Sequence, residues 1–101
     1  MKINLEHENI ELTDAIKEYA EEKFGKLPQY MDDLIIADVR LGKDSQHHEK
    51  GNVFHCRVNL EYPGGSFRAD KTGDDLYKAI NECKEALKMQ IVEFKEKNRN
   101  H

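Results

Sequence analysis

The sequence predicts an α+β fold: a two-layer sandwich with the element order βαβββα, in which two helices cover one face of a four-stranded mixed sheet. Three observations predict it. A strand, an amphipathic helix and a second strand occupy the first 41 residues. Such a unit almost always crosses over right-handed and leaves its strands parallel. Two alternating strands joined by the turn Pro63-Gly64-Gly65 follow, and one long amphipathic helix ends the chain.

The first strand is predicted over residues 2–6, with Ile3 and Leu5 on one face. Thr13 is a suitable N-cap for the first helix, because its hydroxyl can accept a hydrogen bond from a free backbone N–H of the first turn. Apolar side chains recur on one side of this helix: Ile16, Tyr19, Ala20, Phe24 and Leu27. Pro28 is predicted to end the helix, because it cannot donate a backbone hydrogen bond and disfavours helical geometry at Leu27.

The other strands are predicted over residues 34–41, 54–62 and 66–71. The third is the clearest, since apolar and polar side chains alternate over nine residues. Residues 42–51 are polar and flanked by glycine, which predicts a long exposed hairpin loop.

The second helix is predicted to start near Asp74, which can cap it, and to run to about Lys97. Its last turns are expected to project beyond the sheet, and residues 98–101 are expected to fray. Helices and sheet together should enclose one core, formed by Ile16, Phe24, Val39, Cys56, Val58, Leu60, Ile80, Leu87 and Ile91.

Composition predicts a single cytoplasmic domain. The chain has 101 residues, of which 38% are hydrophobic and 36% charged with both signs mixed, as in a folded globule. No apolar run approaches the roughly 18 to 20 residues that span a bilayer, and the charged N-terminus lacks the apolar stretch of a signal peptide. Cys56 and Cys83 lack CxxC spacing and fall on apolar stripes, so both are predicted to be free, buried thiols.

The residues favour no catalytic or metal site. His47, His48, His55 and Cys56 are the candidate metal ligands. Adjacent histidines in a loop diverge, His55 and Cys56 point to opposite faces of their strand, and no second ligand pair has zinc spacing. No paired acid and base or activated nucleophile is indicated either. We therefore expect no metal, no cofactor, no small-molecule substrate and no enzymatic activity.

Function must then lie on a surface. The open face of the predicted sheet offers Arg40, Arg57, Arg68 and His55, interleaved with acids, and is either a solvated face or a contact surface. Lysines lie along both helices among glutamates, a mixture typical of solvent-facing helices. The net charge of −4 is unusual for a protein that binds nucleic acid, since such proteins are generally basic.

Two segments carry a family resemblance. The first includes Asn4-Leu5, the run from Ile10 to Lys17, Lys23-Phe24 and Lys26-Leu27; the second is the run from Asp74 to Asn81. The sequence resembles the short forms of the ribosome hibernation promoting factors and ribosome-associated inhibitors over almost its whole length. This resemblance implies one ribosome-binding domain over residues 1–97, similar in fold to a double-stranded-RNA-binding domain and monomeric in solution.

The resemblance also implies a non-enzymatic translation regulator. Its partner would be the 16S-type rRNA of the small ribosomal subunit, in the channel for mRNA and tRNA, so that ribosomes are silenced or protected under stress or in stationary phase. The RNA-binding residues implied by position are Lys17, Lys23, Lys26, Lys88 and Lys97. Where relatives commonly have basic residues, this chain has Ala86, Met89 and Glu93. The alternative is a protein-binding module of the same fold with reduced RNA affinity.

Overall fold

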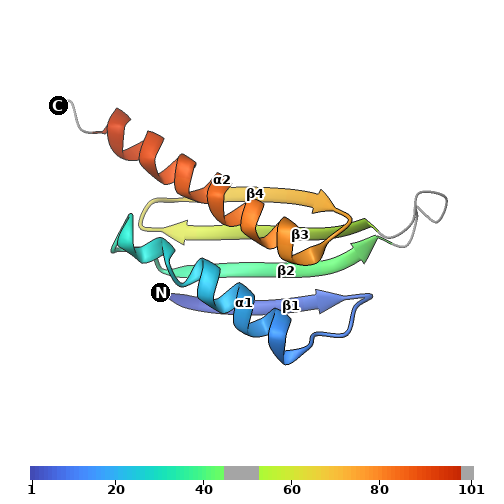
Figure 1. Cartoon of the computed structure of the whole chain (residues 1–101). Coiled ribbons are helices and arrows are strands. Elements are labelled where there is room, and N and C mark those ends of the chain that lie inside the picture. The colour runs from blue at the N-terminus through green and yellow to red at the C-terminus, as the bar shows by residue number, and fades with distance from the viewer. Residues whose placement is uncertain (45–52, 99–101) are drawn as a thin grey trace.

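Two helices lie across one face of a mixed four-stranded sheet (Figure 1). The computed structural model describes residues 1–44 and 53–98. The strands are β1 (Lys2–Glu8), β2 (Ile36–Asp44), β3 (Val53–Tyr62) and β4 (Gly65–Gly73), in that spatial order. Strand β1 pairs with β2 in parallel, and the other two pairings are antiparallel. The helices are α1 (Asp14–Phe24) and α2 (Leu76–Lys97), so the predicted fold class and βαβββα order are confirmed.

Helix α1 starts as predicted and ends earlier. The Thr13 hydroxyl accepts a hydrogen bond from the Ile16 backbone N–H at 3.2 Å, which confirms the N-cap. The helix stops at Phe24, and Pro28 lies in a short 3₁₀ turn, η1 (Leu27–Gln29). The expectation that the helix continues to Leu27 is therefore wrong. Pro28 restricts the conformation of Leu27, and both residues lie in the separate 3₁₀ turn.

The hairpin between β2 and β3 extends further than predicted. Strand β2 begins at Ile36, two residues later than expected, and continues through Gly42 to Asp44. Gly42 lies opposite His55, and a Cβ at this glycine would lie 2.6 Å from the His55 Nε2 atom. Pairing continues here because Gly42 leaves room for the imidazole. The rest of the predicted loop, residues 45–52, lies outside the described residues.

Strand β3 places its apolar side chains toward the helices, and α2 packs on β3 and β4. Asp75, rather than Asp74, caps α2, since its Oδ1 accepts a hydrogen bond from the Tyr77 N–H at 2.9 Å. The predicted core is confirmed with one exception, Ile16, which is only half-buried. The buried members of the predicted set are Phe24, Val39, Cys56, Val58, Leu60, Ile80, Leu87 and Ile91.

The end of α2 projects beyond the sheet, as expected (Figure 1). Among residues 92–98 only Phe94 is half-buried, and its ring packs on Tyr62 and Phe67 with centroid separations of 5.0 and 5.6 Å. Within the described part of the chain, no helix is long and apolar enough to cross a membrane.

Both cysteines are free and fully buried, as predicted. The Cys83 thiol donates a hydrogen bond to the Cys56 carbonyl at 3.0 Å. Contact with Cys83 and burial raise the pKa of the Cys56 thiol, which keeps it protonated at neutral pH.

Both thiols are therefore expected to resist labelling by a maleimide in native buffer and to react rapidly in denaturant. Burial keeps the reagent away from both sulfur atoms. Mass spectrometry of timed samples measures this, and stoichiometric native labelling within the time course of an exposed model thiol would contradict the assigned core.

Candidate nucleic-acid interface

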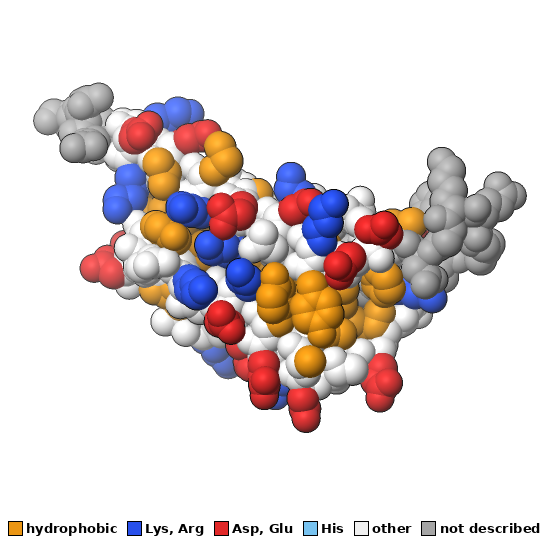
Figure 2. Space-filling view, in the orientation of Figure 1, with side chains coloured by type: hydrophobic (Ala, Val, Ile, Leu, Met, Phe, Trp, Pro, Cys, Tyr) orange, Lys and Arg blue, Asp and Glu red, His pale blue; other side chains and the backbone are white. Residues whose placement is uncertain are grey.

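Lysine side chains from both helices gather along the line where α1 and α2 pack against each other, a surface that we call the groove. Figure 2 shows them as a blue group over the helical layer, with acidic side chains on the outer side of α1. We define the inter-helix lysine cluster as Lys23 of α1 with Lys84, Lys88 and Lys95 of α2. The three α2 lysines are spaced by four and seven residues, so they occupy one flank of the helix.

Two tyrosines position this cluster. The Lys23 Nζ atom lies 5.3 Å from the Tyr19 ring centroid, and the Lys88 Nζ atom lies 5.1 Å from that of Tyr30. Lys95 donates a hydrogen bond to the Tyr30 carbonyl oxygen at 2.8 Å. Both ammonium-ring distances fall in the range of cation–π attraction, so the aromatic rings hold the charges at the groove.

Tyr19 also joins the two helices, because its ring meets the edge of the Tyr77 ring on α2 at a centroid distance of 5.0 Å. The flank of α1 that carries Tyr19 and Lys23 therefore faces α2.

One carboxylate lies within the cluster. The Lys84 side chain is only 11% exposed, and its Nζ atom is 2.8 Å from Glu85 Oε2. The hydrogen bond with Glu85 raises the pKa of Lys84. The same bond lowers the pKa of Glu85, and the charges of Lys84, Lys88 and Lys23 lower it further. Both partners are thus charged at neutral pH, and cations from two helices act on the same carboxylate.

The five lysines predicted from the resemblance do not share one face. Lys23 and Lys88 lie in the cluster, whereas Lys26 forms an ion pair with Glu22 of α1 at 3.6 Å. At 100° per residue, Lys17 lies about 120° around α1 from Lys23. By the same geometry, Lys97 lies about 180° around α2 from Lys88.

Sequence reasoning did not select Lys84 and Lys95 as site residues. Their spacing from Lys88 was a usable signal, since positions four and seven residues apart lie on one helix face. This spacing was hard to recognise because glutamates lie between the lysines. The helix as a whole therefore has the composition of an ordinary solvent-facing helix.

The three α2 positions at which the resemblance implies basic residues and this chain has none lie outside the cluster. Ala86 and Glu93 are about 160° and 140° around α2 from Lys88 by helix geometry, and Met89 is about 100° away. Ala86 packs against the core, while Met89 is 62% exposed. These three positions therefore leave the inter-helix lysine cluster intact.

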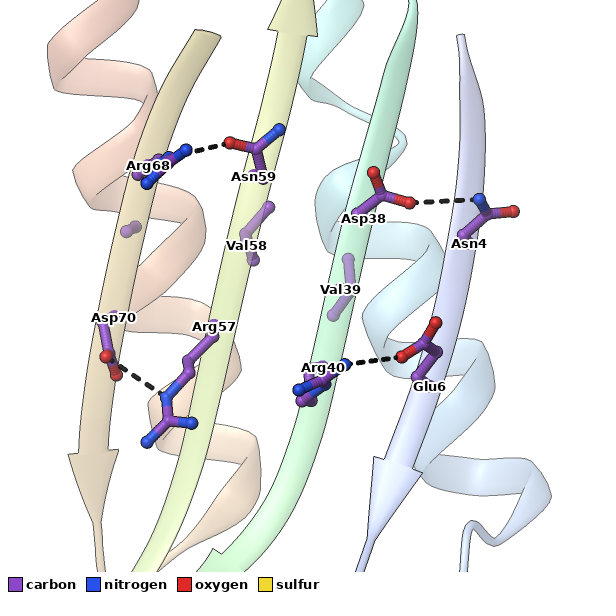
Figure 3. Close-up of a pocket in the computed structure, with 11 residues that line it drawn as sticks. Asn4, Glu6, Asp38, Val39, Arg40, Arg57, Val58, Asn59, Arg68 and Asp70 are labelled. Atoms are coloured by element: carbon purple, nitrogen blue, oxygen red, sulfur yellow. Dashed lines mark hydrogen bonds and ion pairs between the residues drawn. The ribbon is translucent and has the colours of Figure 1, made fainter.

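The open face of the sheet is a shallow hollow of about 740 Å³ whose charged side chains bond one another across strands (Figure 3). Arg40 pairs with Glu6 at 3.0 Å, and Arg57 pairs with Asp70 at 3.2 Å. Arg68 donates to the Asn59 amide oxygen at 3.0 Å. This mutual pairing favours the solvated-face interpretation, and such exposed pairs contribute little to stability.

The expectation that His55 is exposed on that face is wrong, since this residue is buried, with only 6% exposed. Its Nε2 atom lies 3.1 Å from Glu8 Oε1, and the ring occupies the space above Gly42. His55 and Cys56 do point to opposite sides of β3, while His47 and His48 lie outside the described residues. Over residues 1–44 and 53–98, no three His, Cys, Asp or Glu side chains are grouped to hold a metal ion.

Comparison with known proteins gives consistent matches over the whole chain. Residues 3–99 match the family model described as sigma 54 modulation protein / S30EA ribosomal protein. The chain is 33% identical over 101 residues to the ribosome hibernation promoting factor of Escherichia coli, covering all of both proteins. It is 36% identical over 88 residues to the ribosome hibernation promotion factor of Deinococcus radiodurans, covering 86% of this chain but only 45% of that protein.

A solved structure supports the same relationship. The crystal structure of the Thermus thermophilus Protein Y N-terminal domain superposes with a TM-score of 0.78 at 31% identity, covering 93% of this chain and 99% of that domain. The chain therefore belongs to the family of sigma 54 modulation proteins and S30EA ribosomal proteins, which includes the ribosome hibernation promoting factors that its sequence resembles.

Proposed function

We propose that this protein is a ribosome hibernation factor that binds the small ribosomal subunit through rRNA phosphates, at the channel used by mRNA and tRNA. The observation that carries the proposal is the inter-helix lysine cluster, in which four ammonium groups share one groove of a chain whose net charge is −4. Relatives named ribosome hibernation promotion or promoting factor support a ribosomal partner.

The arrangement suits phosphate contact. Lysine ammonium groups bind phosphates as point charges, and here two tyrosine rings and the Tyr30 carbonyl oxygen hold three of the four in place before any partner arrives. Acidic side chains elsewhere, such as those on the outer side of α1, repel the same phosphates (Figure 2). The charge distribution therefore orients the groove toward RNA, which compensates for an unfavourable net charge.

We propose that the protein acts by occupying the channel and catalyses no reaction. A domain seated in the channel excludes mRNA and tRNA while it is bound, so it silences the ribosome without breaking a bond. No cofactor or small-molecule substrate is required, and the protein would act as a monomer in the cytoplasm, where its ribosomal partner resides.

Salt dependence tests the proposal. If Lys84 stays bound to Glu85 and the other three cluster lysines each contact one phosphate, the slope of log affinity against log salt should be about −2.1 to −2.7. Affinity for purified small subunits should then fall roughly 20- to 40-fold between 50 and 200 mM salt. Co-sedimentation through sucrose at a series of salt concentrations measures it. Binding that does not change with salt would contradict RNA contact and favour a protein partner, and absence of binding at 50 mM salt would overturn the proposal.

A further inference from the structure

Glu85 is an acidic side chain bound to one member of the inter-helix lysine cluster, Lys84. It is half exposed, at 51%, whereas its partner Lys84 is nearly buried. The Lys84 ammonium binds the Glu85 carboxylate at 2.8 Å, Lys88 lies one turn further along α2, and Lys23 acts on the same carboxylate from α1. Cations from two helices thus converge on one anion supplied by the protein itself.

The chemistry of that anion resembles that of the proposed ligand. A carboxylate, like a backbone phosphate, carries a negative charge on two oxygens that accept hydrogen bonds from ammonium groups. Because Glu85 is half exposed, its side chain can leave the groove for water at low cost. Lys84 cannot leave as easily, since it is held in the groove with little exposed surface. An ammonium that is held in place by its packed side chain binds another anion when its partner leaves.

We propose that Glu85 occupies the position of one RNA phosphate and competes with it, so that a phosphate contacts Lys84 only when this carboxylate moves aside. The inference deepens the proposed function and rests on it. It assigns Glu85 as a residue that lowers the affinity of the cluster for polyanions in general. In the wild type the phosphates of a partner contact the other cluster lysines, because the intramolecular Glu85 carboxylate competes effectively for Lys84.

The test compares Glu85→Gln with Glu61→Gln. The amide introduced by Glu85→Gln keeps an oxygen that can accept a hydrogen bond from Lys84, so the fold is retained. Glu61 lies on β3, where the strand alternation directs it to the opposite face of the sheet, and its substitution changes net charge by the same amount. Affinity is measured over a range of salt concentrations for two probes, poly(U) RNA and purified small ribosomal subunits, with thermal unfolding as the check on folding.

Glu85→Gln should bind poly(U) about 5-fold more tightly at 0.1 M salt and steepen the salt slope by about 0.7, the contribution of one added phosphate contact to a single strand. Small subunits should show a gain in the same direction. Glu61→Gln should leave the slope unchanged, because a distant charge alters only the general attraction. Equal behaviour of the two variants on both probes would overturn the role of Glu85.

The two probes separate this inference from the proposed function. Glu85→Gln could steepen the salt slope of poly(U) binding while no variant binds small subunits. That result would support the competing carboxylate and overturn the ribosomal function. If subunits bind the wild type but both variants respond alike, the function stands and the inference is overturned. No binding of any variant to either probe would overturn both.

Discussion

Replacing Leu87 by alanine will lower the free energy of unfolding by about 2 to 5 kcal/mol, the range found when a large core side chain is truncated. Leu87 is fully buried at the centre of the α2 stripe, one turn from both Cys83 and Ile91. The helix packs on β3 and β4, so the truncation leaves a cavity between the two layers. Urea titration followed by circular dichroism measures the loss.

Met89→Ala is the matched control for this change. Met89 lies on the same helix and is 62% exposed, so its truncation should alter stability by no more than about 0.5 kcal/mol. If the Leu87 variant lost less than about 1 kcal/mol, or if the two variants lost equal amounts, the face of α2 assigned to the core would be wrong.

Reversing charge at Lys23 and Lys88 together, to glutamate, will weaken binding to small ribosomal subunits roughly 40-fold at 0.1 M salt. The figure assumes that each lysine contributes one phosphate contact, worth about sixfold at this salt concentration. The two ammonium groups come from different helices and meet at the same groove, each held over a tyrosine ring. The salt slope should decrease by about 1.4 to 1.8.

Lys17→Glu with Lys97→Glu provides an equal change of charge on the same two helices. Helix geometry places these lysines about 120° and 180° from Lys23 and Lys88, away from the groove. The control should retain most of the wild-type salt slope, and both double variants should unfold near the wild-type temperature. A control that binds as weakly as the groove variant would show that the RNA interface lies elsewhere.

The fold was predictable because its determinants are local. The alternation through β3 and the helical stripes through Phe24 and Leu87 each identify an element and its buried face from sequence alone. The length of the hairpin and the burial of His55 were not predictable, since both depend on the absence of a side chain at Gly42, on the neighbouring strand.

The candidate site was only partly predictable for a related reason. Helical periodicity reveals which lysines share a flank, but it does not tell which flank faces the other helix. That information comes from tertiary contact, here the packing of Tyr19 on Tyr77. The resemblance supplied Lys23 and Lys88 by position, while Lys84 and Lys95 required knowledge of how the helices pack.

The projecting end of α2 makes part of the lysine cluster conditional on local folding. Beyond Ile91 the helix has one half-buried side chain, Phe94, and the bond from Lys95 to the Tyr30 carbonyl. Its last turns can unwind while the sheet and the rest of the core remain intact, an opening that costs far less than global unfolding. Each such opening removes Lys95 from the groove. The full cationic cluster therefore exists only in molecules whose final turns are formed, and a partner that engages Lys95 selects those molecules from the ensemble.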